Sequence, residues 1–214
     1  MSQSNDTQPE YSVIPVLQHD NPGLLIFTFL FPRSENNPNS HQVILVADLS
    51  TKAITIRSCL EDIDEATVQE LTREVEQRLT LRSQWIARMK ELVTTVEKIA
   101  KENDWKTKVL SKKLKDRAFG EHFVPSLVMQ KDLCQLMLEA HGRTAPGVEG
   151  GFAGIYLMPA YDDAASLYFY NNCWNIHARE RRSTVIARVA YGEARELTRE
   201  SLVDILEGLH ANAS

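Results

Sequence analysis

The sequence predicts an α+β protein with two antiparallel three-stranded sheet layers, joined and covered by a central helical segment over about residues 62–141. Three observations support this class. Short apolar runs end at proline or at polar turns, as strands do. The stretch between Pro38 and Gly120 contains neither glycine nor proline, and most of it has helical periodicity. An order of three strands followed by a helix occurs in both halves of the chain.

Three strands are expected in the first half of the chain. Leu24–Phe31 is a continuous apolar run closed by Pro32, and because it is too short for a buried helix it predicts a buried strand. Residues 42–47 and 53–57 predict the second and third strands, joined as a hairpin. Residues 1–20 begin with a run rich in Ser, Asn, Gln and Asp, which predicts a disordered N-terminal tail.

A long amphipathic helix is expected next, opened by a capping pair at Asp62 and Glu65. Its apolar positions form two stripes: Val68, Leu71, Val75 and Leu79, then Trp85, Ile86, Met89, Leu92, Val93, Val96, Ile99 and Ala100. One helix over residues 62–103 would be roughly 60 Å long, whereas a compact globule of this size is roughly 45 Å across. We therefore expect a break between Thr80 and Ser83. The alternative is an unbroken helix that projects and pairs with another element.

The second half is expected to begin with a helix over residues 126–141, ended by Gly142. A glycine-rich connection leads into a strand at Phe152–Met158. Further elements are a hairpin of residues 166–170 and 173–178 around Asn171-Asn172, a strand at 184–190 and a last helix capped by Thr198.

Two α+β parts follow from this order, residues 21–120 and residues 121–214, either separate or packed as one globule. The repeated order indicates either a duplication or two halves that merely share a common order of elements. Both readings stay open, because few residue identities match between the halves. At the level of fold alone, three strands backed by helices resemble small acidic chaperones of secreted effectors, although no residue motif is shared.

Composition excludes several classes of protein. With 43% hydrophobic and 25% charged residues, the chain matches ordinary soluble globular proteins. A formal net charge of −5 argues against general attraction to nucleic acid or to an anionic membrane. The start is polar and lacks the order of a secretory signal, and no apolar run is long enough to span a bilayer. Three widely spaced cysteines favour a reducing cytoplasm over a disulfide framework.

The hairpin around Asn171-Asn172 provides the leading functional hypothesis. Strand alternation places Tyr168, Tyr170, Asn175 and His177 on one face, together with Cys173. Tyrosine is enriched in interfaces, so this face predicts a partner-binding surface, and the helical stripe containing Trp85 and Met89 is a second candidate. The expected function is that of a non-enzymatic protein-binding, adaptor or chaperone-like module that binds another protein or a second copy of itself. The alternative is that a helix covers this face.

The sequence carries no motif that identifies a catalytic chemistry or a metal site. Cys173 and His177 lie four residues apart on one strand, about 13 Å of rise, which is too far for a direct nucleophile–base pair. No Cys-x-x-Cys or helical His-x-x-x-His spacing predicts a metal, and no cofactor is expected. An enzyme with a site near His177, gathering Cys173 and either Asp162 or Asp163, is the second alternative function.

A basic segment supports the first alternative, which is nucleic-acid binding. Between Lys98 and Arg117 there are eight cations and three acids in a chain that is acidic overall. Such asymmetry is typical of an anion-binding stripe. The candidate residues are Lys106, Lys108, Lys112, Lys113, Lys115, Arg117, Arg179, Arg181 and Arg182.

Overall fold

The computed structural model describes residues 11–18, 21, 23–32, 41–58, 63–144, 148, 150–178 and 194–213. The chain divides into two compact units. Unit 1 comprises Met1–Arg82 and Lys115–His122, and unit 2 comprises Ser83–Leu114 and Phe123–Ser214. The described residues form two antiparallel sheets and two helices, which confirms the α+β class.

Unit 1 contains a four-stranded sheet in the order β1-β2-β3-β4. Its strands are β1 (Ser12–Leu17), β2 (Leu24–Phe31), β3 (His41–Asp48) and β4 (Ile54–Ser58). One face of this sheet carries Phe27, Phe29 and Leu45, which are 0–1% exposed. Tyr11 packs its ring against Phe29 with 5.5 Å between centroids, and its hydroxyl donates to Glu74 of helix α1 (Glu65–Glu102), so this is the face that the helix covers.

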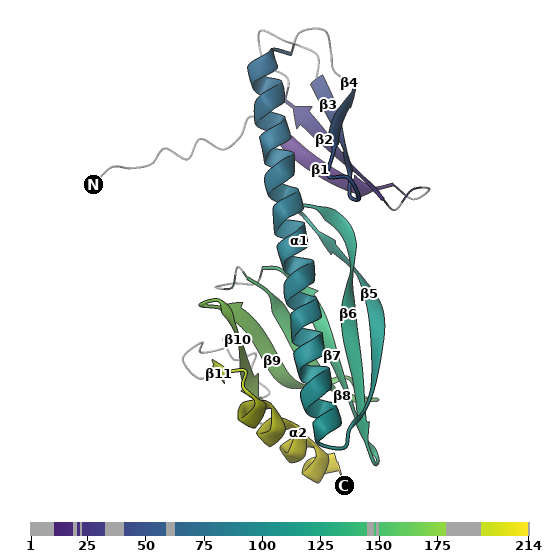
Figure 1. Cartoon of the computed structure of the whole chain (residues 1–214), viewed down its shortest axis with the longest axis vertical. Coiled ribbons are helices and arrows are strands. Elements are labelled where there is room, and N and C mark those ends of the chain that lie inside the picture. The colour runs from purple at the N-terminus through teal and green to yellow at the C-terminus, as the bar shows by residue number, and fades with distance from the viewer. Residues whose placement is uncertain are drawn as a thin grey trace, which may run out of the picture. The chain divides into compact units, whose positions relative to one another are not determined.

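Helix α1 (Glu65–Glu102) is one unbroken element. Asp64 caps its start, since the Thr67 amide donates to Asp64 Oδ1 at 2.7 Å. The chain leaves the helix through Asp104, which has a left-handed backbone conformation. The Trp105 amide then donates to the Ala100 carbonyl oxygen at 3.0 Å. Figure 1 shows the first half of α1 along the sheet of unit 1 and the second half along the sheet of unit 2.

Unit 2 is built on a seven-stranded meander in the order β11-β10-β9-β8-β7-β6-β5. The strands are β5 (Lys106–Asp116), β6 (Gly120–Lys131), β7 (Cys134–Gly142), β8 (Phe152–Met158), β9 (Asp162–Tyr170), β10 (Cys173–Ala178) and β11 (Arg195–Glu196). The turn between β5 and β6 belongs to unit 1. Each strand pairs with its neighbour in sequence, and the pairs β6–β7, β7–β8, β8–β9, β9–β10 and β10–β11 are antiparallel.

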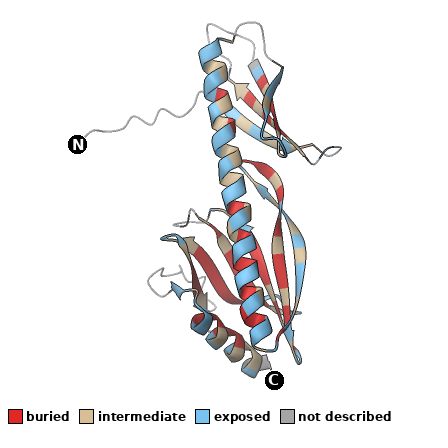
Figure 2. Cartoon of the chain, in the orientation of Figure 1, coloured by how far each residue is buried: buried red, intermediate tan, exposed pale blue. Residues whose placement is uncertain are grey.

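The core of unit 2 lies between this sheet and its helices. Leu136, Leu138 and Leu167 are completely buried, and so are Trp85 and Met89 of α1 (Figure 2). Helix α2 (Arg199–Ala213) contacts β7 and β10 through the predicted apolar face, in which Leu202 and Leu206 are completely buried. Thr198 caps α2 as predicted, because its hydroxyl accepts from the Ser201 amide at 3.1 Å.

The Gly-rich connection has a packing role in unit 2. A Cβ on Gly151 would lie 2.7 Å from the Trp85 ring and 2.9 Å from the Trp174 ring. Gly151 also has φ 152°, a conformation that L side chains rarely adopt. The glycine therefore lets the backbone approach two indole rings closely.

Three predictions about the helices are wrong. Residues 126–141 form β6 and β7 instead of a helix, because their apolar side chains alternate: Leu127 and Met129, then Leu136 and Leu138, are all completely buried. The basic residues after Glu102 form β5, so the central helical segment is α1 alone. The break between Thr80 and Ser83 is absent, since that segment contains no residue that interrupts a helix.

The sheet count is also corrected. The sheets have four and seven strands instead of three each, and the element order of the two halves does not repeat. Residues 12–17, expected within a disordered tail, form β1 because they alternate exposed and half-buried positions beside β2. The capping residue of α1 is Asp64, while Asp62 lies outside the described residues. The strand expected at 184–190 also lies outside them.

Candidate binding surfaces

The predicted hairpin has the predicted register. Tyr170 pairs with Cys173, Phe169 with Trp174 and Tyr168 with Asn175. Asn171 and Asn172 have φ values of 52° and 59°, as the two-residue turn requires. The face carrying Phe169 and Trp174 lies against α1, because the Arg88 guanidinium sits 4.3 Å from the centre of the Phe169 ring.

The candidate partner-binding residues are mostly inside unit 2. Trp85 and Met89 are 0% exposed, because the stripe they belong to faces the sheet. Tyr168 is 4% exposed and stacks on Phe152 at 5.2 Å, and Asn175 is 5% exposed. These four side chains belong to the core instead of a surface. Tyr170 and His177 are half-buried and remain accessible at the end of the sheet.

A layer of polar side chains crosses the sheet of unit 2 on the face opposite α1. Register places Glu139 beside Gly154, Gly154 beside Ser166, and Ser166 beside His177. Above this row, Tyr156 hydrogen-bonds His141 Nε2. A Cβ on Gly154 would lie 2.9 Å from both bonded atoms, so glycine makes room for the pair. This layer was not predicted because residues 126–141 were expected to form a helix. On a strand, Glu139 and His141 are two residues apart and lie on the same face, and that spacing would have indicated the layer.

Glu139 is the charged centre of this layer and is 7% exposed. Its Oε2 accepts from Lys112 Nζ at 2.6 Å and from the Tyr161 hydroxyl. Burial raises the pKa of Glu139, but these hydrogen bonds outweigh burial and hold the pKa below its ordinary value. The carboxylate therefore stays ionised and paired, which is typical of a structural network.

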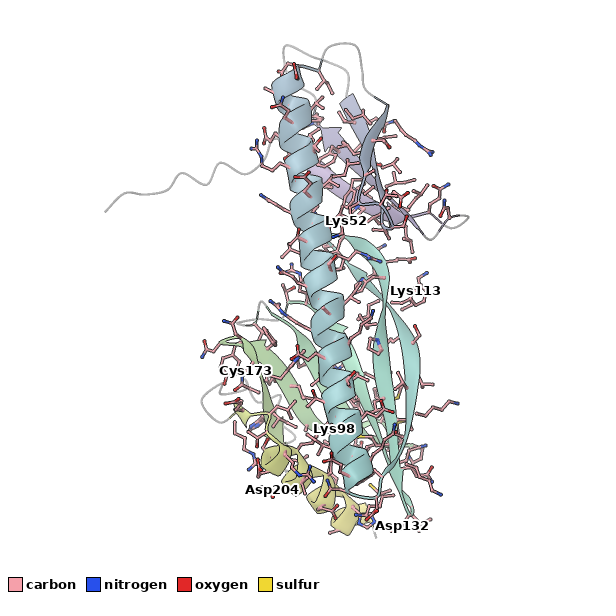
Figure 3. The ribbon with its side chains drawn as sticks, viewed as in Figure 1. Lys52, Lys98, Lys113, Asp132, Cys173 and Asp204 are labelled. Atoms are coloured by element: carbon pink, nitrogen blue, oxygen red, sulfur yellow. The ribbon has the colours of Figure 1, made fainter. Side chains whose placement is uncertain are left out.

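The basic segment is divided between the two units. Lys106, Lys108 and Lys113 are exposed in unit 2 (Figure 3 labels Lys113), and Lys115 and Arg117 are exposed in unit 1. Lys112 is engaged with Glu139. Since β5 is an edge strand, exposed lysines also protect it from pairing with other chains. Arg179, Arg181 and Arg182 lie outside the described residues.

The described groups of the alternative catalytic site lie on two neighbouring strands, β9 and β10. Cys173 and His177 lie on β10 at the spacing expected from the sequence, and Cys173 Sγ donates to the Tyr170 carbonyl oxygen at 3.5 Å. Asp162 is exposed at the start of β9. Within the described part of the chain, no three His, Cys, Asp or Glu side chains gather as a metal site. No helix found there has an apolar stretch long enough to cross a membrane.

Each unit has a groove lined by described residues. The groove of unit 1, of about 500 Å³, runs along the charged side of α1 beside Tyr11. Residues that line this groove already hydrogen-bond one another, since Arg78 donates to Glu74 Oε1 at 2.9 Å and to the Ala118 carbonyl oxygen at 2.8 Å. The groove of unit 2, beside Cys173, has about 250 Å³, less than most ligand pockets.

The second face of the sheet in unit 1 is apolar as well, and we name it the open face. It consists of Ser12, Ile14, Val16, Leu24, Ile26, Thr28, Leu30, Gln42, Ile44, Val46, Asp48 and Thr55. Register joins these positions across the strands, with Ile14 beside Thr28, Thr28 beside Ile44, and Val46 beside Thr55. Ile14 and Val16 are each 47% exposed, whereas Val46 is 3% exposed.

The open face was missed because β1 was expected to be part of a disordered tail. One signal was available in the sequence. The continuous apolar run Leu24–Phe31 places apolar side chains on both faces of a strand, and α1 covers only the face with Phe27 and Phe29. An antiparallel sheet with one solvated face normally alternates apolar and polar residues.

Comparisons with known proteins add no relative. No family model matches the sequence, and no curated protein and no solved structure is significantly similar to it.

Proposed function

We propose that this chain is a non-enzymatic protein-binding module and that its open face receives the partner. The observation that carries the proposal is the apolar character of both faces of one sheet. Seven of the face residues are Ile, Val or Leu: Ile14, Val16, Leu24, Ile26, Leu30, Ile44 and Val46. Contiguous apolar patches of this kind mark sites of interaction with proteins.

The other surfaces support this function less well. The hairpin of β9 and β10 presents only Tyr170 and His177 among its predicted binding residues. Nucleic-acid binding through the basic segment stays a prediction, weakened by the engagement of Lys112 with Glu139. An enzymatic site near His177 also stays a prediction. Adaptor and chaperone-like roles are special cases of protein binding and depend on which protein is bound.

Site-specific photo-crosslinking tests the proposal. A photoreactive amino acid replaces Ile14 on the open face or, as the matched control, Ile56 of β4. Ile56 is 43% exposed on the same sheet, but it pairs with Leu45 and so belongs to the other face. In a native extract we expect a protein adduct at position 14, none at position 56, and loss of the adduct when Leu30→Lys is added.

Equal labelling at both positions, or no adduct at position 14, would contradict the proposed function. Circular dichroism of each variant verifies that the sheet is intact. Insensitivity of the adduct to Leu30→Lys would also count against the open face, because it would show contact without dependence on the apolar surface.

A further inference from the structure

We infer that the outer edge of β5 binds an extended acidic peptide, which adds a strand to the sheet of unit 2. This surface goes beyond the proposed function, because it belongs to a different unit from the open face. Its basis is the combination of a long exposed sheet edge and a row of lysines along it.

Length and composition single out β5 among the sheet edges. It ends the strand order of unit 2, with β6 as its neighbour (Figure 1). It has 11 residues, whereas strands most often have about 5–6, and it contains no proline, so each of its residues has an amide hydrogen. The other terminal strands offer less, because β1 contains Pro15, and β4 and β11 have 5 and 2 residues.

The backbone of this edge can bind a further strand. An edge strand directs part of its N–H and C=O groups toward its neighbour and the rest outward. An extended peptide hydrogen-bonds such outward groups and so continues the sheet. In β5 the side chains of Lys106, Lys108, Val109 and Ser111 are exposed, that of Val109 by 48%. A peptide can therefore reach this stretch of the edge.

The charge of the edge favours an acidic peptide. Residues 106–114, the part of β5 in unit 2, include four lysines and no acidic residue. Lys112 is paired with Glu139, whereas Lys106 and Lys108 are exposed. The chain as a whole has a formal net charge of −5, so the edge is a local positive region on an acidic protein.

Glu97 of α1 contacts the start of β5, but its charge is balanced within the helix. Its Oε1 accepts from the Thr107 hydroxyl at 3.1 Å and lies 2.8 Å from Lys101 Nζ. This ion pair joins two residues of α1 that are four positions apart. Glu97 therefore does not take up the charge of Lys106 or Lys108.

Alternation along β5 defines the peptide sequence that fits best. Lys106, Lys108 and Leu110 lie on one face of the strand. A peptide strand beside them is matched when it carries acidic residues at two alternate positions and an apolar residue at the next one. The lysines oppose pairing with β5 of a second copy, because like charges directly opposite each other are destabilising. They thus protect the edge from most strands and select an acidic one.

A nucleic acid suits this edge less well. β5 has no aromatic side chain on which a base could stack. A phosphate backbone also has no amide groups that could extend a sheet, whereas the backbone of a strand is arranged to pair with another strand. The edge therefore favours an acidic peptide over a nucleic acid.

Fluorescence anisotropy with the purified full chain tests the inference. The probe is a fluorescein-labelled peptide of about ten residues in which glutamate and valine alternate, which spans about 33 Å when extended. We expect saturable binding as the chain is raised from about 1 to about 500 µM. Lys108→Glu should weaken binding at least about fivefold, because it replaces an attraction by a repulsion. Lys90→Glu, the same change of charge at an exposed position of α1, should alter binding less than about twofold.

Two further measurements separate strand addition from general attraction between charges. The same peptide with N-methyl groups on its central amides keeps its charge but loses the hydrogens it would donate, so it should bind at least about tenfold more weakly. When the unmodified peptide is bound, amide hydrogen exchange of β5 should slow, while that of β4, an edge of the sheet in unit 1, stays unchanged. The exchange measurement uses the unchanged chain, so it decides the question even if Lys108→Glu fails to fold.

Other results would overturn the inference. Equal binding of the N-methylated and unmodified peptides would show attraction of charge alone. Tighter binding of a fluorescein-labelled oligothymidylate than of the peptide would assign the lysines to nucleic acid. Absence of saturable peptide binding, or equal effects of Lys108→Glu and Lys90→Glu, would remove the β5 edge as the site. Each of these results leaves the proposed function in place, because the open face is tested by the adduct at position 14.

Discussion

Replacing Lys112 by methionine removes the cation beside a buried carboxylate and keeps most of the side-chain stem. In the folded chain, Lys112 Nζ lies 2.6 Å from Glu139 Oε2. The side chains of Lys112 and Glu139 are 29% and 9% exposed. The variant Lys112→Met therefore leaves a largely buried carboxylate with the Tyr161 hydroxyl as its remaining hydrogen-bond donor.

The size of the effect follows from this geometry. Breaking a fully buried ion pair costs about 3–5 kcal/mol, and a hydrogen bond to a charged group contributes about 1.5–3 kcal/mol. Because water can reach the partly exposed Lys112 position and Tyr161 still donates to Glu139, we expect a loss of stability below that of a fully buried ion pair. Lys112→Met should reduce the free energy of unfolding of unit 2 by about 2 kcal/mol at pH 7.

The pH dependence provides the sharper signature. The folded-state pKa of Glu139 is depressed, so its pairing stabilises the fold above the ordinary carboxyl pKa of about 4.3. This stability is lost as the pH falls through the folded-state pKa, where the carboxylate takes up a proton. The difference between the unchanged chain and Lys112→Met should be complete at neutral pH and should shrink once the pH falls below about 4.

Urea unfolding followed by tryptophan fluorescence measures this difference. The three tryptophans, Trp85, Trp105 and Trp174, all lie in unit 2 and are at most 7% exposed, so the signal reports on that unit. Lys108→Met, an exposed change on the same strand, is the control and should alter stability by less than about 0.5 kcal/mol. Equal losses for both variants, or a loss that persists unchanged in acid, would refute the role assigned to the pair.

Substitutions at three further positions test local features. Thr198→Ala removes the hydroxyl that accepts from the Ser201 amide and should cost about 1 kcal/mol, read from the urea midpoint. Gly154→Ala brings a methyl group to 2.9 Å from His141 Nε2, so it should separate His141 from Tyr156 and lower the free energy of unfolding by about 1–2 kcal/mol. The His141 ring signals in nuclear magnetic resonance should shift, and unchanged signals would contradict this. Asn172→Val should lower the melting temperature because a branched residue resists φ near 59°, while Asn172→Gly should not; similar melting of the two would argue against a strained turn.

Short-range features were predictable because they depend on neighbouring residues in the chain. The β9–β10 register followed from a two-residue turn, and the α2 cap followed from Thr198 at its start. The strand β8 was recognised from its apolar run and its following proline. Each of these depends on local backbone geometry and on hydrogen bonds made within a few residues.

The candidate surfaces depend on contacts that are distant in the sequence. Residues 126–141 satisfy a helical and an alternating pattern at once, and pairing of β7 with β8 selects the strand. Burial of Tyr168 follows from stacking on Phe152, which no spacing of residues indicates. Exposure of Ile14 depends on which face of the sheet α1 covers.

The sequence by itself determined that the chain is an acidic α+β protein with an aromatic hairpin, a long amphipathic helix and a capped last helix, because turns, caps and periodicity are local properties. The tertiary structure alone decided that the tyrosine face is mostly core, that Glu139 is paired with Lys112, and that α1 covers one apolar face of the sheet in unit 1 and not the other. Burial and pairing are set by which elements pack together, and the free energy of that packing belongs to the whole fold.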